Sequence, residues 1–96
     1  MTKDKTKEVL RDPKSWKEIE RLGNAYRVVV FEAYGIVAER IQTMTRYIDW
    51  EHTHDYRDPV KIENWVDCGQ FLLVDGHRER ISDTDLLRQV WEASRG

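Results

Sequence analysis

The feature that most constrains the fold is a stripe of apolar residues across residues 25–50. Residues 28–31 have strong strand propensity, and Thr43 and Thr45 also favour strands. The apolar positions nevertheless step by three and four residues, at Tyr26, Val30, Ala33, Tyr34, Val37, Ile41, Met44 and Ile48. Because such a period over so long a window outweighs local propensity, the stripe predicts one continuous, central helix. A pair of strands around Gly35 is the alternative.

Two shorter helices are expected near the ends of the chain. Asp12-Pro13 is typical of an N-cap followed by proline at the first helical position. Towards the C-terminus, Ser82 is a typical N-cap, and Ile81 and Leu86 stand where a hydrophobic staple would place them. These signals predict a short first helix and a longer final helix.

Residues 58–76 allow two interpretations. After Asp58-Pro59, apolar residues again follow a helical period, at Ile62, Trp65, Val66, Gly69, Leu72 and Leu73. Asp75-Gly76 is also a typical hairpin turn at the end of a strand. Residues 77–80 do not alternate between apolar and polar side chains, so we favour the helix. The chain is therefore predicted to be an all-α bundle of about four helices, with an α+β fold containing a short antiparallel sheet as the alternative.

Composition narrows the class of protein without naming a function. The 96 residues are enough for one small domain, and we expect a flexible N-terminus over residues 1–11 and a single helical domain over residues 12–96. A net charge of −2 argues against strong nucleic-acid binding. The single cysteine, with neither an apolar membrane span nor a signal peptide, predicts a cytoplasmic protein. A helix apolar on several sides predicts a homo-oligomer.

Two acidic residues, Glu63 and Asp67, stand four positions apart in residues 61–74. On a helix this spacing makes the two side chains neighbours. Neighbouring carboxylates repel each other unless a cation or a basic group lies between them, and Gly69 would allow a ligand to approach closely. The pair therefore suggests a divalent-metal site, with a solvated acidic edge as the alternative.

Residues 62–71 (Ile-Glu-Asn-Trp-Val-Asp-Cys-Gly-Gln-Phe) resemble the acidic helix of the all-α nucleotide pyrophosphohydrolases, the MazG-like and dUTPase-like superfamily. They are most similar to a phage and bacterial branch, and residues 37–41 resemble the partner helix of that branch. The resemblance implies a Mg²⁺- or Mn²⁺-dependent enzyme that cleaves a nucleoside triphosphate between its α and β phosphates. It implies that the metal ligands and catalytic residues are Glu39, Glu63 and Asp67, and that the nucleotide contacts Arg40, Arg46, Lys61 and Asn64.

This sequence departs from the family pattern on the partner helix. The family carries two acids three residues apart there, whereas Ile36 and Gln42 flank Glu39 at that spacing. The nucleotide site could therefore be catalytically degenerate. The alternative function is a non-enzymatic helical interaction module, of phage or bacterial origin, that binds itself or a protein partner. The two hypotheses differ in whether Glu39, Glu63 and Asp67 converge within reach of one ion.

Overall fold

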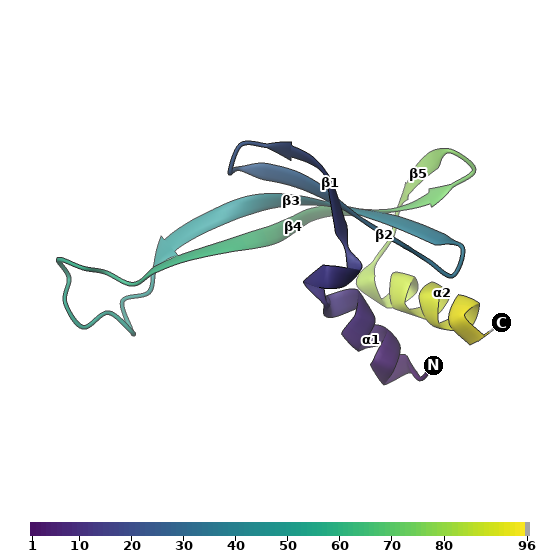
Figure 1. Cartoon of the computed structure of the whole chain (residues 1–96), viewed down its shortest axis with the longest axis horizontal. Coiled ribbons are helices and arrows are strands. Elements are labelled where there is room, and N and C mark those ends of the chain that lie inside the picture. The colour runs from purple at the N-terminus through teal and green to yellow at the C-terminus, as the bar shows by residue number, and fades with distance from the viewer. Residues whose placement is uncertain (96) are drawn as a thin grey trace.

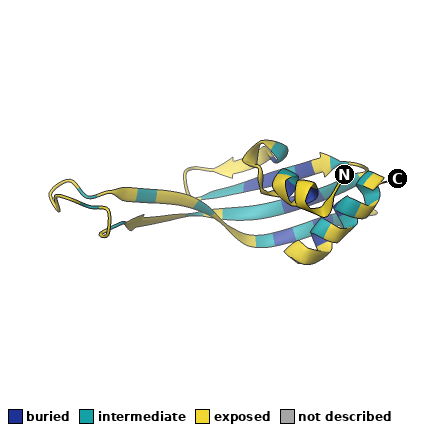
Figure 2. Ribbon diagram, turned by 90° about the horizontal axis from the view of Figure 1, so that it is seen from below, coloured by how far each residue is buried: buried dark blue, intermediate teal, exposed yellow. Residues whose placement is uncertain are grey.

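The computed structural model describes residues 1–95 and shows a five-stranded antiparallel sheet with two helices on one face (Figures 1 and 2). The strands follow the chain order β1-β2-β3-β4-β5, so each strand pairs with its neighbours in sequence. The elements are α1 (Lys3–Arg11), a 3-10 turn η1 (Pro13–Ser15), β1 (Lys17–Leu22), β2 (Tyr26–Ala33), β3 (Ile36–Ile48), β4 (Lys61–Val74), β5 (His77–Arg80) and α2 (Asp83–Arg95).

The predicted all-α helical bundle is wrong, and the long central helix is replaced by β2 and β3. These strands meet at a turn of Tyr34 and Gly35, whose φ angles are 55° and 73°. The strand pair around Gly35 was the alternative to the helix. The helical period misled because both faces of β2 carry buried apolar residues. Val29 lies on the helix side and Val28 on the other side, yet each is only 4% exposed.

The predicted helix over residues 58–76 is also wrong, because these residues form β4 and part of its hairpin with β5. Asp75 and Gly76 occupy the turn with φ angles of 49° and 80°. Two successive positive φ angles belong to the hairpin turn whose twist matches that of the strands. The strand β5 is an exposed edge strand, so its residues have no buried face and need not alternate.

The final helix is confirmed as α2, whose N-terminal Ser82 Oγ accepts a hydrogen bond from Asp85 N. Ile81 and Leu86, the expected staple residues, are both buried in the core. The N-terminal region differs from the expected flexible terminus, because residues 3–11 form α1 and bury Thr6 and Leu10. Asp12 and the following proline begin the 3-10 turn η1 rather than a longer helix.

The hydrophobic core lies between the two helices and one end of the sheet (Figure 2). It consists of Leu10, Trp16, Val29, Phe31, Ala38, Leu72, Ile81, Leu86 and Val90. The Trp16 and Phe31 rings lie 5.6 Å apart between centroids and anchor the link between η1 and β1 to the sheet. Burial of these apolar side chains is the main source of stability in a domain of this size.

The strands β3 and β4 continue beyond the rest of the sheet. Pairing of β2 with β3 ends at Thr43, whereas β3 and β4 remain paired out to Ile48 and Lys61. Residues 45–64, which we call the arm, are therefore a two-stranded ribbon closed by a loop (Figure 1). The arm makes the molecule 55 × 30 × 19 Å, with a radius of gyration of 16.5 Å. A compact chain of this length would have a radius of gyration of about 12.5 Å.

Among the described residues, neither helix is long and apolar enough to cross a membrane.

Candidate functional site

The structure does not bring together the three carboxylates expected to bind metal. Glu63 and Asp67 lie on one face of β4, four residues apart, which is about 13 Å along a strand. Glu39 lies on the opposite face of the sheet, since it pairs with Val30 and alternates with the helix-facing Ala38. Oxygen ligands of one Mg²⁺ lie about 2.1 Å from the ion, so these three groups cannot share one.

Each of the three carboxylates instead has a partner on another strand of the sheet. Glu39 is buried and accepts hydrogen bonds from Arg78 at 2.6 and 3.5 Å. Glu63 accepts a 3.1 Å bond from Arg46. Asp67 accepts a 2.6 Å bond from Gln42 Nε2 and lies 3.7 Å from Arg40 Nε. Cross-strand pairs of opposite charge stabilise a sheet, which gives these acids a structural role.

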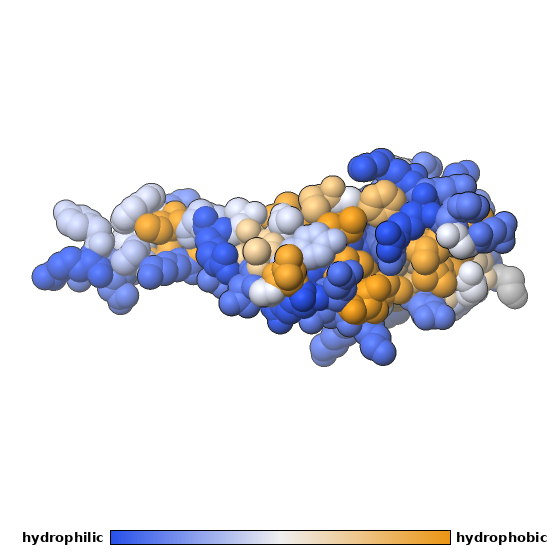
Figure 3. Space-filling view, turned by 90° about the horizontal axis from the view of Figure 1, so that it is seen from above, coloured by the Kyte–Doolittle hydropathy of each residue, from blue (hydrophilic) through white to orange (hydrophobic). Residues whose placement is uncertain are grey.

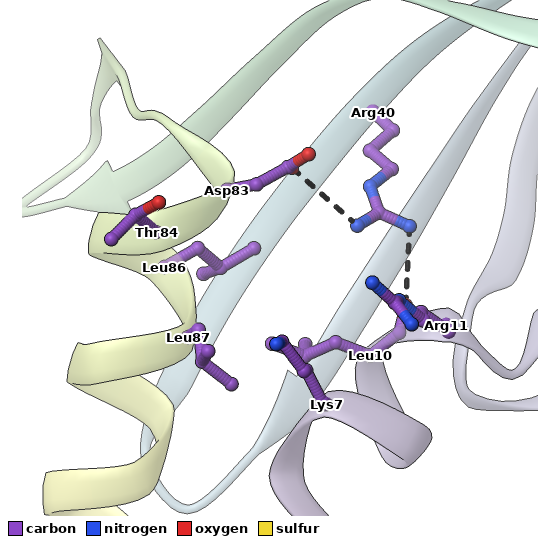
Figure 4. A pocket seen from close by; sticks show the side chains of 8 residues that line it. All are labelled: Lys7, Leu10, Arg11, Arg40, Asp83, Thr84, Leu86 and Leu87. Atoms are coloured by element: carbon purple, nitrogen blue, oxygen red, sulfur yellow. Dashed lines mark hydrogen bonds and ion pairs between the residues drawn. The ribbon is translucent and has the colours of Figure 1, made fainter. Parts of the chain in front are cut away.

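The four residues expected to bind nucleotide are also separated. Arg46 and Lys61 line a shallow hollow of about 200 Å³ on the arm, together with Glu63. Asn64 belongs to the opposite face of the same ribbon, since it alternates with Glu63 along β4. Arg40 lies at the junction between the helices and the sheet, towards the body of the molecule (Figure 4).

Arg40 connects four elements at this junction. Its Nε donates to Gln70 Oε1 on β4 at 2.7 Å, and its Nη1 donates to the carbonyl of Leu10 near the end of α1 at 3.2 Å. Its guanidinium carbon lies 3.9 Å from the centre of the Trp16 ring, and Trp16 Nε1 donates to the same Leu10 carbonyl at 2.9 Å. One of the unpaired carbonyls at the end of α1 is thereby satisfied.

The charge of Arg40 is balanced by the protein itself. Asp67 lies 3.7 Å from the guanidinium and Asp83, at the start of α2, lies 4.0 Å from it. The cavity beside it, about 260 Å³, is lined by Lys7, Leu10, Arg11, Arg40, Asp83, Thr84, Leu86 and Leu87 (Figure 4). Because its most buried cation already faces two carboxylates, we assign Arg40 to holding the helices on the sheet.

Arginine and tryptophan side chains cover the sheet where the helices end. Arg27 stacks on Trp65 at 4.4 Å, and Arg21 lies 5.4 Å from the same ring. Arg27 and Trp65, together with Arg40 and Trp16, border a second cavity of about 310 Å³. Long arginine side chains can cover apolar surface with their methylene groups while the charge remains near water. This stack joins the body to the base of the arm.

The loop at the end of the arm is held in shape by its own hydrogen bonds. Asp49 N donates to the carbonyl of Val60 at 2.9 Å, which closes the loop at its base. Thr53 Oγ1 donates to the Asp49 carbonyl at 2.6 Å and accepts from Val60 N at 3.0 Å. Surface loops are usually more mobile than the strands that they connect. The internal hydrogen bonds of this loop restrict it to one conformation.

Two carboxylates organise the turns within this loop. The side chain of Asp49 lies 2.7 Å from His52 Nδ1 and also accepts from His52 N, and the hydrogen bond from the ring lowers the pKa of Asp49. Asp55 accepts from the backbone N–H and then the guanidinium of Arg57, which lowers its pKa too. Asp49, Glu51 and His52 have ligand atoms within 4.8 Å of one another, but the bonds between Asp49 and His52 account for that grouping.

The arm exposes aromatic side chains to solvent. Tyr56 is 82% exposed, Trp50 61% and Tyr47 52%. None of them belongs to the core cluster. These side chains were not singled out in the sequence analysis, although a tryptophan and a tyrosine within a charged segment are a usable signal. Tryptophan and tyrosine are the residues most enriched in the energetic centres of protein interfaces.

Comparison with known proteins gives no family for this chain. No protein-family model matches it, and neither a curated protein nor a solved structure is significantly similar to it. The function of the arm is therefore inferred from its geometry and chemistry alone.

Proposed function

We propose that this protein is a non-enzymatic interaction module that binds a protein partner through the arm, with Trp50 and Tyr56 as the anchoring side chains. The observation that supports this proposal is the combination of order and exposure in residues 45–64. They add nothing to the core, yet their loop is closed by internal hydrogen bonds and presents two large aromatic side chains.

An ordered loop lowers the entropic cost of binding. Each mobile side chain that an interface immobilises costs about 0.5–1.5 kcal/mol, and a mobile backbone adds to that cost. The bonds of Asp49, Thr53 and Val60 fix the loop before any partner arrives. Trp50 and Tyr56 have large, stiff side chains that lose little freedom on burial. The loop is thus preorganised for recognition.

The charge of the loop specifies the chemistry of the partner. Residues 49–60 contain four acids, Asp49, Glu51, Asp55 and Asp58, and one counter-charge, Arg57. A partner that matches this loop presents a basic surface around an apolar pocket able to receive an aromatic ring. Charges at the rim of an interface mainly accelerate association, so binding is expected to weaken as the salt concentration rises.

The alternative function, a Mg²⁺-dependent nucleotide pyrophosphohydrolase, has no comparable support in the geometry. That function needs carboxylates that converge on one metal ion. Glu39, Glu63 and Asp67 point to separate regions and each is paired with a basic or amide side chain. The interaction module requires only the exposed arm.

A photo-crosslinking experiment tests the proposal. The full chain carries p-benzoylphenylalanine at position 50 or, as a control, at Tyr34, which is 47% exposed at the turn between β2 and β3. In cells that contain the natural partner, the proposal expects a discrete adduct from position 50. Excess wild-type protein should suppress this adduct, whereas the double variant Trp50→Ala, Tyr56→Ala should not.

The cross-linked protein is then purified and its affinity measured. Trp50→Ala is expected to weaken binding at least about 30-fold, the equivalent of a 2 kcal/mol anchor. The control Tyr34→Asn should bind like the wild type, since asparagine tolerates a positive φ. Equal affinity of the wild type and Trp50→Ala, or adducts from position 34 alone, would overturn the proposal.

A further inference from the structure

The face of the sheet opposite the helices is uncovered, and we call it the open face (Figure 3). Its central positions are mostly apolar. Val28 is buried, Val30, Val37, Ile41, Phe71 and Leu73 are partly buried, and the buried Glu39 lies among them. The register places these side chains on one face of β2, β3 and β4, because residues that are paired across strands, or two positions apart on one strand, point to the same side. An antiparallel sheet with one solvated face normally alternates to polar side chains there. The open face does not follow that pattern.

One row of the open face ends in exposed apolar side chains on both sides, with the partly buried Tyr26 and the polar Thr43 between them. Leu22, Tyr26, Thr43 and Val66 follow one another across β1 to β4 in the register. Leu22 is 74% exposed and Val66 is 46% exposed. Contiguous apolar patches of this kind are typical of surfaces that another protein covers.

The edge strand β1 carries a positive and a negative side chain that could pair with the same two side chains of a second copy. Lys17 pairs with Val30 and Glu20 with Val28, so both side chains lie on the open face at successive positions. Within the described residues neither forms an ion pair. Consider a two-fold axis that is perpendicular to the strands and passes between these two positions. It would place Lys17 of each copy against Glu20 of the other copy, which gives two ion pairs.

We propose that the open face binds a second copy of this chain, in a face-to-face dimer whose two-fold axis runs across the strands. Two sheets packed in this way form a sandwich with side chains interdigitating over about 10 Å. A two-fold contact is made by the same patch on both copies, which the Lys17 and Glu20 pair satisfies. The proposal is independent of the arm, and in this dimer the two arms project in opposite directions.

The chain exposes more surface than a compact monomer of its mass. The chain exposes 7170 Å², whereas a monomeric protein of 11.5 kDa exposes about 5,800 Å². The excess of about 1,400 Å² exceeds the roughly 800 Å² that each partner buries in an interface of standard size.

Sedimentation equilibrium of the full chain between roughly 1 and 200 µM, a range suited to micromolar dimers, tests the proposal. The wild type is expected to reach about twice its mass of 11.5 kDa. Val66→Lys, at an exposed position of the open face, should weaken the dimer at least about tenfold, because it would bury an unpaired charge. Val60→Lys, at a 37% exposed position on the arm against 46% for Val66, is the matched control and should dimerise like the wild type.

A charge exchange tests the orientation of the two copies. Lys17→Glu and Glu20→Lys should each weaken the dimer severalfold, and the double variant should restore it, because the exchanged charges again face each other. Circular dichroism confirms that each variant is folded. A wild type that stays monomeric, or a Val66→Lys variant that dimerises as tightly as the wild type, would overturn the dimer. Failure of the double variant to recover would overturn the axis across the strands.

Discussion

At the scale of single residues, Arg40 is the side chain on which most elements depend. It hydrogen-bonds Gln70 and the Leu10 carbonyl and stacks on Trp16. A cation stacked on an aromatic ring away from water contributes about 2 kcal/mol, and hydrogen bonds to charged groups add about 1.5–3 kcal/mol each. These contributions overlap because the same side chain makes all of them.

We therefore expect Arg40→Met to lower the free energy of unfolding by about 2–4 kcal/mol in urea denaturation at neutral pH. Arg40→Lys should recover little, because an ammonium group cannot stack as a plane on Trp16 and reach Gln70 and Leu10 at once. An Arg40→Lys variant within about 0.5 kcal/mol of the wild type would show that the charge alone matters at this junction.

The positions of single residues explain why a metal site was predicted and why the structure does not contain it. Glu63 and Asp67 are neighbours only if the chain between them is helical. On β4 the same spacing keeps them on one face but places three residue pairs of the β3–β4 ladder between them. Arg40 was expected to contact a nucleotide, whereas its partners in the structure are Leu10 of α1, Gln70 of β4 and Trp16, which follows η1. Those partners are distant in sequence and no local pattern names them.

At the scale of elements, the sequence signals at turns and caps were more informative than periodicity. Asp75-Gly76 and Ser82 each mark a boundary that the structure contains. The helical period failed over β2 and β3 because the sheet buries apolar residues on both faces near its centre. A strand buried on both faces loses its alternation, so its pattern can coincide with a helical one. The tertiary contacts that decide between them are absent from a local window.

The order of the loop of the arm is expected to depend on pH. The pKa values of Asp49 and Asp55 are lowered by hydrogen bonds from His52 and Arg57. A carboxyl whose pKa is lower in the folded loop than in the unfolded chain stabilises the fold above the unfolded value, near 4. This contribution disappears as the pH falls through the lowered folded value.

We therefore expect the amide signals of His52 and Arg57 to lose their dispersed chemical shifts between about pH 4 and 2, while core signals change later. The measurement is a series of amide NMR spectra on lowering the pH. Asp49→Asn should remove the transition at His52 and leave that at Arg57 unchanged. A loop that keeps its shifts down to the pH of global unfolding would contradict this role of the carboxylates.

At the scale of the whole molecule, a small hydrophobic core at one end stabilises an elongated fold. Leu86 and Val90 of α2 are fully buried, whereas the arm adds no residue to the core cluster. Stability is therefore concentrated in one end of the molecule. Removing a buried leucine side chain costs about 2–5 kcal/mol, which is a large share of the 5–15 kcal/mol typical of a domain.

We expect Leu86→Ala to lower the melting temperature by at least about 10 °C, since 1 kcal/mol corresponds to about 4–8 °C in a domain of this size. Tyr56→Ala, at an 82% exposed position of the arm, is the matched comparison and should change it by less than about 3 °C. Both are measured by thermal unfolding at the same protein concentration. A comparable loss in Tyr56→Ala would mean that the arm and the core unfold as one unit.

The ribbon of the arm has no lateral neighbours beyond Thr43, and this has a consequence for how the length of the molecule can vary. Inserting two residues in each strand preserves which side chains face up or down and moves the loop outward by about 7 Å. Inserting one residue in each strand moves it half as far and turns the loop over. The reach of this molecule is therefore adjustable in discrete steps, by natural variation or by design, while the helices and the core stay as they are.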